Sequence, residues 1–212
     1  MLRIDETSKT LVAPQAGGLV TEGRPDRGEL LALLTGSWEA FSAELGHASL
    51  RLAAAEPIPG LDILAFDEQA GRAVVVQVTD AVAVGEVGRA LAAAAQVASW
   101  DAAALAAVHE SLSAAVPGDS PQVVLLAAAF DARTLATVDW LTRRHGLEIS
   151  CFVLSVFRFG AERLLSIRRE YPARDAHAPD PAAEVQRMLA GDAPNGDAAM
   201  AANGHSTPPP TA

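Results

Sequence analysis

Residues 60–79, GLDILAFDEQAGRAVVVQVT, constrain the fold of this chain more than any other stretch. Residues 61–66 form a short apolar run that contains one acid, Asp62, and residues 73–78 form a second run that is rich in valine. The glycine and polar residues between the two runs are typical of a turn. The pattern therefore predicts two strands joined by a turn, the second of them buried on both faces of a sheet.

Polar side chains fall at definite positions on these two strands. Because residues two apart on a strand point to the same face, Gln77 and Thr79 share a face. If the strands are paired, we expect both side chains to look toward Asp62. The sequence thus predicts a small polar site inside an otherwise apolar sheet.

The rest of the chain alternates predicted helices with predicted strands. Helices are expected over 26–45, with a break near Gly36, over 85–116, with a break near Asp101, and over 133–145. Further strands are expected over 48–56, 122–128, 149–157 and 163–171, with a weak hairpin over 2–14 and a glycine-rich loop over 16–24. This alternation predicts an α/β fold in which a central mixed sheet, with the Asp62 and Gln77 strands adjacent in its middle, is flanked by helices on both faces.

Length and composition indicate one globular domain with a tail. The chain has 212 residues, of which 50% are hydrophobic, and this is enough for a sizeable core over residues 1–172. From residue 173 to 212 the composition shifts to Ala, Pro, Asp, Gly and Asn, which is typical of a flexible segment. Within this tail, a short helix is predicted over 181–190, with Val185, Met188 and Leu189 on one face.

Charge and cysteine content limit the classes of partner. A net charge of −10 disfavours binding to nucleic acid, although a local basic patch would override the mean. The single cysteine, Cys151, lies in an apolar run, so we expect a buried thiol and a reducing cytoplasmic setting. The charged N-terminus lacks the core of a signal peptide, and no apolar run reaches the ~18 residues of a membrane helix. The bias toward alanine and arginine is typical of a bacterial genome rich in G and C.

An acid on one strand, a hairpin, and two polar residues two positions apart together resemble the PD-(D/E)XK nuclease superfamily. In that superfamily, which has the restriction-endonuclease-like fold, an Asp and the Glu of Glu-X-Lys hold a divalent metal, and the Lys positions or activates water. Here the Asp stands as Asp62, whereas Glu-X-Lys has become Gln77-Val78-Thr79. The general layout of residues 2–172 also resembles this family. The resemblance implies a restriction-endonuclease-like core in which Asp62 is a weak or lost metal ligand and Gln77 and Thr79 are degenerate catalytic positions.

The resemblance also points to residues outside the two strands. Related proteins often carry an extra acid on the helix that precedes the core, and either Asp26 or Glu29 stands at that place. The alternative is that these acids are simply favoured in the first turn of a helix by its dipole. Arg72 and Arg89 are the candidates for a cation that has moved into the site to replace the missing lysine.

Two functions follow from this pattern. An amide oxygen is a poorer Mg²⁺ ligand than a carboxylate, and threonine has no cationic head to stabilise a developing anion. The first hypothesis is therefore a catalytically degenerate nuclease-fold protein, with no cofactor, that acts as a binding or assembly module for an unknown macromolecule or as a homodimer. The alternative is an active Mg²⁺-dependent endonuclease, acting on DNA or RNA, with a relocated active site. The histidines are dispersed, and neither a serine-nucleophile elbow nor a Walker loop is present.

Overall fold

A computed structural model describes residues 2–5, 10–12, 19–22, 25–80, 83–159 and 162–172, the first three ranges by their backbone alone. The strands are β1 (Leu2–Asp5), β2 (Thr10–Val12), β3 (Leu19–Glu22), β4 (Leu50–Ala55), β5 (Ile63–Asp67), β6 (Arg72–Val78), β7 (Gln122–Ala127), β8 (Ile149–Phe159) and β9 (Glu162–Tyr171). The helices are α1 (Arg27–Gly36), α2 (Trp38–Glu44), α3 (Val84–Ala98), α4 (Ala102–Val108), the 3₁₀ helix η1 (Glu110–Ala114) and α5 (Ala132–His145).

The strands form one mixed sheet. Its order is β2-β1-β9-β8-β7-β6-β5-β4, and β3 pairs with β8 beside this path. The β6–β7 and β7–β8 pairs are parallel, whereas the other pairs are antiparallel. The parallel pairs are connected by segments that contain α3 and α5, as a parallel crossover requires. The chain is therefore an α/β protein, as the sequence predicts.

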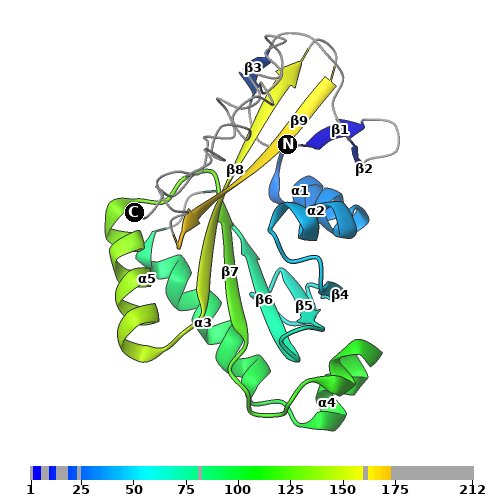
Figure 1. The fold of residues 1–212 in the computed structure, drawn as a ribbon, viewed down its shortest axis with the longest axis vertical. Coiled ribbons are helices and arrows are strands. Elements are labelled where there is room, and N and C mark those ends of the chain that lie inside the picture. The colour runs from blue at the N-terminus through cyan, green and yellow to red at the C-terminus, as the bar shows by residue number, and fades with distance from the viewer. Residues whose placement is uncertain are drawn as a thin grey trace, which may run out of the picture. The chain divides into compact units, whose positions relative to one another are not determined.

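Helices cover both faces of the sheet (Figure 1). One face packs against α1 and α2, and the other packs against α3, α5 and the segment around α4 and η1. The side chains of β6 alternate between these faces: Val74, Val76 and Val78 join the α1–α2 side, while Ala73 and Val75 join the α3–α5 side. Beyond the end of β7, β8 and β9 continue together as a long antiparallel pair, with β3 paired to the outer part of β8 and β1 paired to β9 (Figure 1).

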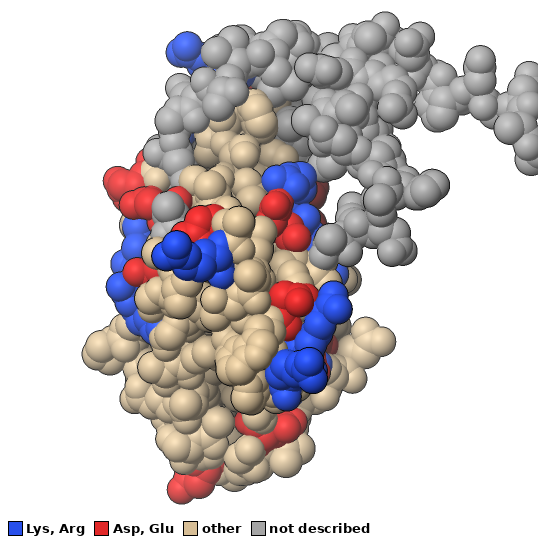
Figure 2. Space-filling model, turned by 90° about the vertical axis from the view of Figure 1, so that its left-hand side faces the viewer, with Lys and Arg blue, Asp and Glu red and all other residues tan. Residues whose placement is uncertain are grey.

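The surface on the side of α5 carries both signs of charge. Figure 2 shows acidic and basic side chains interspersed on this face, with a broad uncharged area between them. On α5 itself, Arg143 and Asp139 form an exposed ion pair with an N–O distance of 2.7 Å. On the part of this face that the structure describes, neither sign forms a continuous field.

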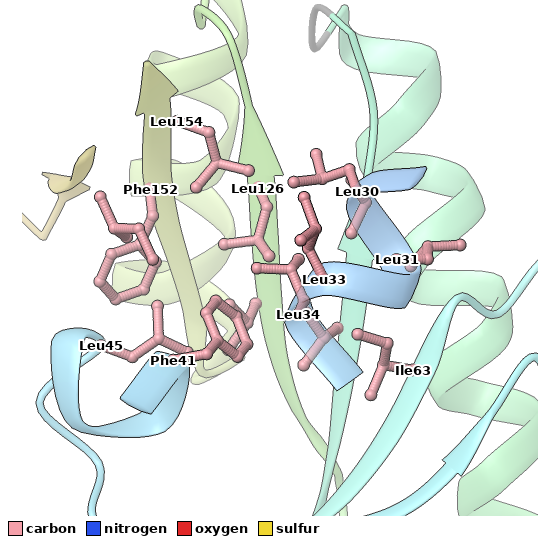
Figure 3. Packing of buried hydrophobic residues seen from close by; sticks show 14 of the residues in the cluster. Leu30, Leu31, Leu33, Leu34, Phe41, Leu45, Ile63, Leu126, Phe152 and Leu154 are labelled. Carbon is pink, nitrogen blue, oxygen red and sulfur yellow. The ribbon is translucent and has the colours of Figure 1, made fainter. Parts of the chain in front are cut away.

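The α1–α2 face shows how the sequence specifies its packing. Leu30, Leu33 and Leu34 of α1 recur at helical spacing and are almost fully buried. In Figure 3 these leucines, with Phe41 and Leu45, lie against side chains of the sheet; those labelled are Ile63, Leu126, Phe152 and Leu154. The indole N–H of Trp38 donates a buried hydrogen bond of 2.9 Å to the Leu50 carbonyl and fixes α2 on β4.

Most of the predicted elements are found close to their expected bounds. The break near Gly36 separates α1 from α2, and Asp101 caps α4 by accepting a 2.8 Å hydrogen bond from the Ala104 N–H. Gly146 ends α5 in the left-handed conformation, with φ of 68°. Cys151 is fully buried, and burial, followed by the nearby charge of Glu170, raises the pKa of its thiol to about 12.

Two expectations need correction. Residues 16–24 were predicted as a loop, but Leu19–Glu22 forms β3 and pairs with the outer part of β8. This pairing partner is more than 130 residues away, so the glycine-rich local composition does not reveal it. The Asp62 and Gln77 strands are adjacent, but β5 lies next to β4, the last strand in the sheet order, rather than in the middle. The predicted tail, with its helix over 181–190, lies outside the described residues.

Candidate functional site

The site forms where β5 begins and β6 ends. The antiparallel register pairs Ile63 with Val76, and one further step places Asp62 opposite Gln77. Alternation along the strands puts both side chains on the same face of the sheet. The Asp62 side chain is fully buried and Gln77 is 3% exposed, so both polar groups are withdrawn from water. Burial of this kind is costly unless the groups are hydrogen-bonded or paired.

Donors from three directions satisfy the Asp62 carboxylate. Its Oδ2 accepts hydrogen bonds from Gln77 Nε2, at 3.0 Å, and from the backbone N–H of Val78, at 2.5 Å. Its Oδ1 accepts from a guanidinium nitrogen of Arg27, which also forms an ion pair with it. The carboxylate is therefore both hydrogen-bonded and charge-compensated, which is what a buried acid requires.

Arg27 is the first residue of α1 and closes the site from outside. Its side chain is 49% exposed, and the same Nη2 also donates to Glu56 Oε1, at 3.2 Å. The pKa of Arg27 is raised, chiefly by the hydrogen bond to Asp62. Glu56 stands at the corner after β4 with φ of 46°, a left-handed conformation that is uncommon for a residue other than glycine. The corner thus brings a second carboxylate to the same guanidinium.

A pocket of about 180 Å³ opens beside this ion pair. Its described lining residues are Arg27, Gly60, Asp62, Gln77, Val78, Thr79, Asp80, Glu86 and Arg89. Arg89 of α3 donates to Glu86 Oε1 at 2.8 Å, one turn away on the same helix. Two oxygens, Gln77 Oε1 and Glu86 Oε2, are buried and have no hydrogen-bond partner within the part of the chain that the structure describes.

The three strand residues selected from the sequence meet in this pocket. Asp62, Gln77 and Thr79 all line it, as the period of two predicts. The two acids proposed on the entry helix do not. Asp26 caps α1, accepting a 2.8 Å hydrogen bond from the Glu29 N–H. Glu29 pairs with Arg163 of β9 at 3.1 Å. Neither acid lines the pocket: Glu29 lies in the first turn of α1, where the helix dipole favours an acid, and Asp26 is the N-cap residue before that turn.

Of the two candidate cations, Arg89 of α3 lines the pocket and Arg72 of β6 does not. Arg72, at the start of β6, contacts the Glu148 carboxylate through its two terminal guanidinium nitrogens, Nη1 and Nη2, with N–O distances of 2.5 Å. It is therefore committed to a second ion pair, at the far end of the strand from Asp62. Arg89 is the candidate whose position agrees with the hypothesis of a relocated cation.

Sequence reasoning missed the ion-pair partner of Asp62. Arg27 stands between the two acids that were selected, 35 positions before Asp62. Its role depends on the packing of α1 against the sheet, which no local pattern encodes. Glu86 was also missed, although its spacing of three from Arg89 on a predicted helix is a signal for an ion pair.

The residues present do not fit a Mg²⁺ site. Mg²⁺ is held by one or two carboxylates and keeps several waters in an octahedral arrangement. Both oxygens of Asp62 already accept hydrogen bonds, and Gln77 turns its amide nitrogen toward them. The guanidinium of Arg27 would repel a divalent cation at this carboxylate. Among the described residues, no group of three or more His, Cys, Asp or Glu side chains is placed to hold a metal ion.

A larger pocket has a different character. It measures about 520 Å³ and is lined mainly by small and apolar side chains, with Ser99, Ser120 and Glu148 as its polar members. Its walls are α3, the segment before β7 and the segment before β8. The Asp62 pocket, in contrast to this apolar one, is lined by several buried polar groups. It is therefore the candidate functional site.

Comparison with models of protein families, with curated proteins and with solved structures gave no match to this chain. Among the described residues, no single helix has both the length and the apolar character needed to cross a membrane. Taken together, α3 and α4 meet those two criteria, but they are bent by 114° relative to each other.

Proposed function

We propose that this chain is a binding or assembly module built on a nuclease-like α/β scaffold whose catalytic positions no longer serve a metal. The observation that carries this proposal is the ion pair between Arg27 and the buried Asp62. A guanidinium supplies the positive charge that a buried carboxylate needs, so a metal is not required to stabilise it. A divalent cation would have to displace Arg27 and leave that arginine without its partner.

The missing catalytic groups support the same proposal. Hydrolysis of a phosphodiester depends on metal charge and positioned donors to stabilise developing negative charge. Gln77 and Thr79 contribute an amide and a hydroxyl where a carboxylate and an ammonium would be needed. The proposed partner is a protein, either another macromolecule of the same cytoplasm or a second copy of this chain, since a net charge of −10 disfavours a polyanion.

One observation favours the alternative of a relocated nuclease site. Asp80, Glu86 and Arg89 line the same pocket as Asp62, so further acids and a cation are within its walls. A relocated site would use these groups with Mg²⁺ while Asp62 stays in its ion pair. An activity assay separates the two functions.

The test is cleavage of single- and double-stranded DNA and of RNA by the whole chain with Mg²⁺ or Mn²⁺. The matched variants are Asp62→Asn, which keeps the side-chain shape, and Glu86→Gln. We expect no cleavage by the wild type above a buffer control. Cleavage that either substitution abolishes would refute the proposed function and establish the alternative. Sedimentation equilibrium on the same preparation distinguishes a self-assembling module from one that needs another partner.

A further inference from the structure

The Asp62 pocket contains hydrogen-bond acceptors that no described group satisfies. Gln77 is 3% exposed, and its amide orientation is set because Nε2 donates to Asp62 Oδ2. The remaining amide oxygen, Oε1, has no donor, and neither has Glu86 Oε2. Leaving a buried acceptor unsatisfied costs roughly 1–3 kcal/mol, so a donor that enters here is favoured by the loss of that penalty. Both side chains line the same pocket.

Charge and size define which donor fits. Both unsatisfied atoms are acceptors, and Glu86 Oε2 belongs to a carboxylate. A hydrogen bond from an ionised donor to a carboxylate is roughly twice as strong as one between neutral groups, so a cationic donor is preferred to a neutral donor or an anion. A volume of about 180 Å³ is below the roughly 300 Å³ at which pockets for larger ligands begin. A compact cation with several N–H donors meets all three conditions.

We propose that this pocket binds a primary ammonium group, with Gln77 Oε1 and Glu86 Oε2 as acceptors. An ammonium has three donors on one small charged head, which is enough to supply a donor to each oxygen. This inference rests on the proposed function, because a binding module would receive the ammonium as the tip of a lysine side chain on its protein partner. A free small amine is the other source of the same chemistry.

The experiment is an NMR titration of the whole chain, following the side-chain amide of Gln77. The probe is n-butylammonium chloride at constant ionic strength. Tetramethylammonium, which has the same charge but no N–H donor, is the control ligand. We expect a saturable shift with a Kd of about 1–10 mM for butylammonium and no saturation with tetramethylammonium. No shift with butylammonium, or equal shifts with both cations, would overturn the inference.

Variants assign the acceptors without disturbing the core. Glu86→Gln removes the charge of one of the two acceptors and should weaken butylammonium binding at least about fivefold. Glu39→Gln, an exposed acid on α2, is the matched control and should leave the Kd unchanged. Unchanged binding in Glu86→Gln would contradict the assignment of this carboxylate.

Further ligands identify the source of the ammonium. Nα-acetyl-lysine N-methylamide, whose ε-amine is free, mimics a lysine within a protein. Tighter binding of this compound than of butylammonium would indicate a protein partner. Tighter binding of 1,4-diaminobutane would indicate a free polyamine. Tighter binding of methylguanidinium than of any ammonium would contradict the proposed ligand class. Failure of every ammonium in a protein that does not cleave nucleic acid would reject this inference alone, whereas metal-dependent cleavage would reject the proposed function.

Discussion

Asp62 carries a buried charge that three donors from two separate parts of the chain stabilise. Gln77 and the Val78 N–H belong to the neighbouring strand, whereas Arg27 arrives from the start of α1. The alternation of side chains along paired strands predicts the contact between Gln77 and Asp62, because residues opposite each other in register point to the same face. It does not predict the arginine, because that contact exists only once α1 has packed on the sheet. At this scale the sequence locates the acid but not what neutralises it.

Replacing Arg27 should lower the stability of the fold, because it leaves the buried charge of Asp62 without a partner. We expect Arg27→Met to lower the free energy of unfolding by about 1–3 kcal/mol, since Asp62 would lose its ion-pair partner. Chemical denaturation at neutral pH measures this change. The loss should shrink in an Asp62→Asn background, where no charge needs compensation.

Arg51→Met is the control for this prediction. Arg51 pairs with Glu68 at 3.0 Å, and both side chains are about half exposed. Such a surface pair contributes only about 0–1 kcal/mol, so its loss should change stability little. Equal effects of Arg27→Met and Arg51→Met would show that the Asp62 ion pair contributes no more to stability than an exposed surface pair.

His47 makes a second residue-scale prediction. Burial and then the charge of Arg169 lower the pKa of His47 in the folded state. The unfolded chain, with a histidine pKa of about 6.5, therefore binds the proton more tightly. Stability is unaffected by this group above that pKa, falls as the pH drops below about 6.5, and levels off below the lowered pKa. We expect the decline in Tm between about pH 7.5 and about pH 5.5 to be smaller in His47→Gln. A steeper decline in that variant would contradict this.

At the scale of elements, strong local patterns predict well and non-local pairing does not. The leucines of α1 recur at helical spacing, and the β-branched, nearly continuous apolar run of β6 is typical of a strand buried on both faces. The strand β3 is different, because it forms against β8 far along the chain and its own sequence carries glycine. The same limit explains why neither Glu29 nor Arg72 could be excluded from the site beforehand. Their ion pairs, with Arg163 and Glu148, are tertiary contacts.

The packing of α1 should be sensitive to single truncations. Leu34 is fully buried between α1 and the sheet (Figure 3). We expect Leu34→Ala to lower the free energy of unfolding by about 2–5 kcal/mol, because it removes apolar contacts and leaves a cavity. Glu39→Ala, at an exposed position of α2, should change it by no more than about 0.5 kcal/mol. Equal losses would argue against the α1–sheet interface.

For the whole molecule, the sequence predicts a globular domain over residues 1–172 followed by a tail over residues 173–212. Since residues 173–212 contain few large apolar side chains, we expect truncation after Pro172 to change Tm by no more than about 2–3 °C. Differential scanning calorimetry of the two lengths measures this. A larger drop would show that Val185, Met188 and Leu189 contribute to the core.

The central claim is that Arg27, rather than a metal, neutralises Asp62, and Mn²⁺ binding tests it most directly. Water-proton relaxation or electron paramagnetic resonance measures the affinity of the whole chain for Mn²⁺, with Asp62→Asn as the comparison. We predict no Asp62-dependent, saturable Mn²⁺ binding with a Kd below about 1 mM. The reason is that the Arg27 guanidinium is already paired with this carboxylate and repels the ion. Saturable binding with a Kd of about 100 μM or less that disappears in Asp62→Asn would contradict the account.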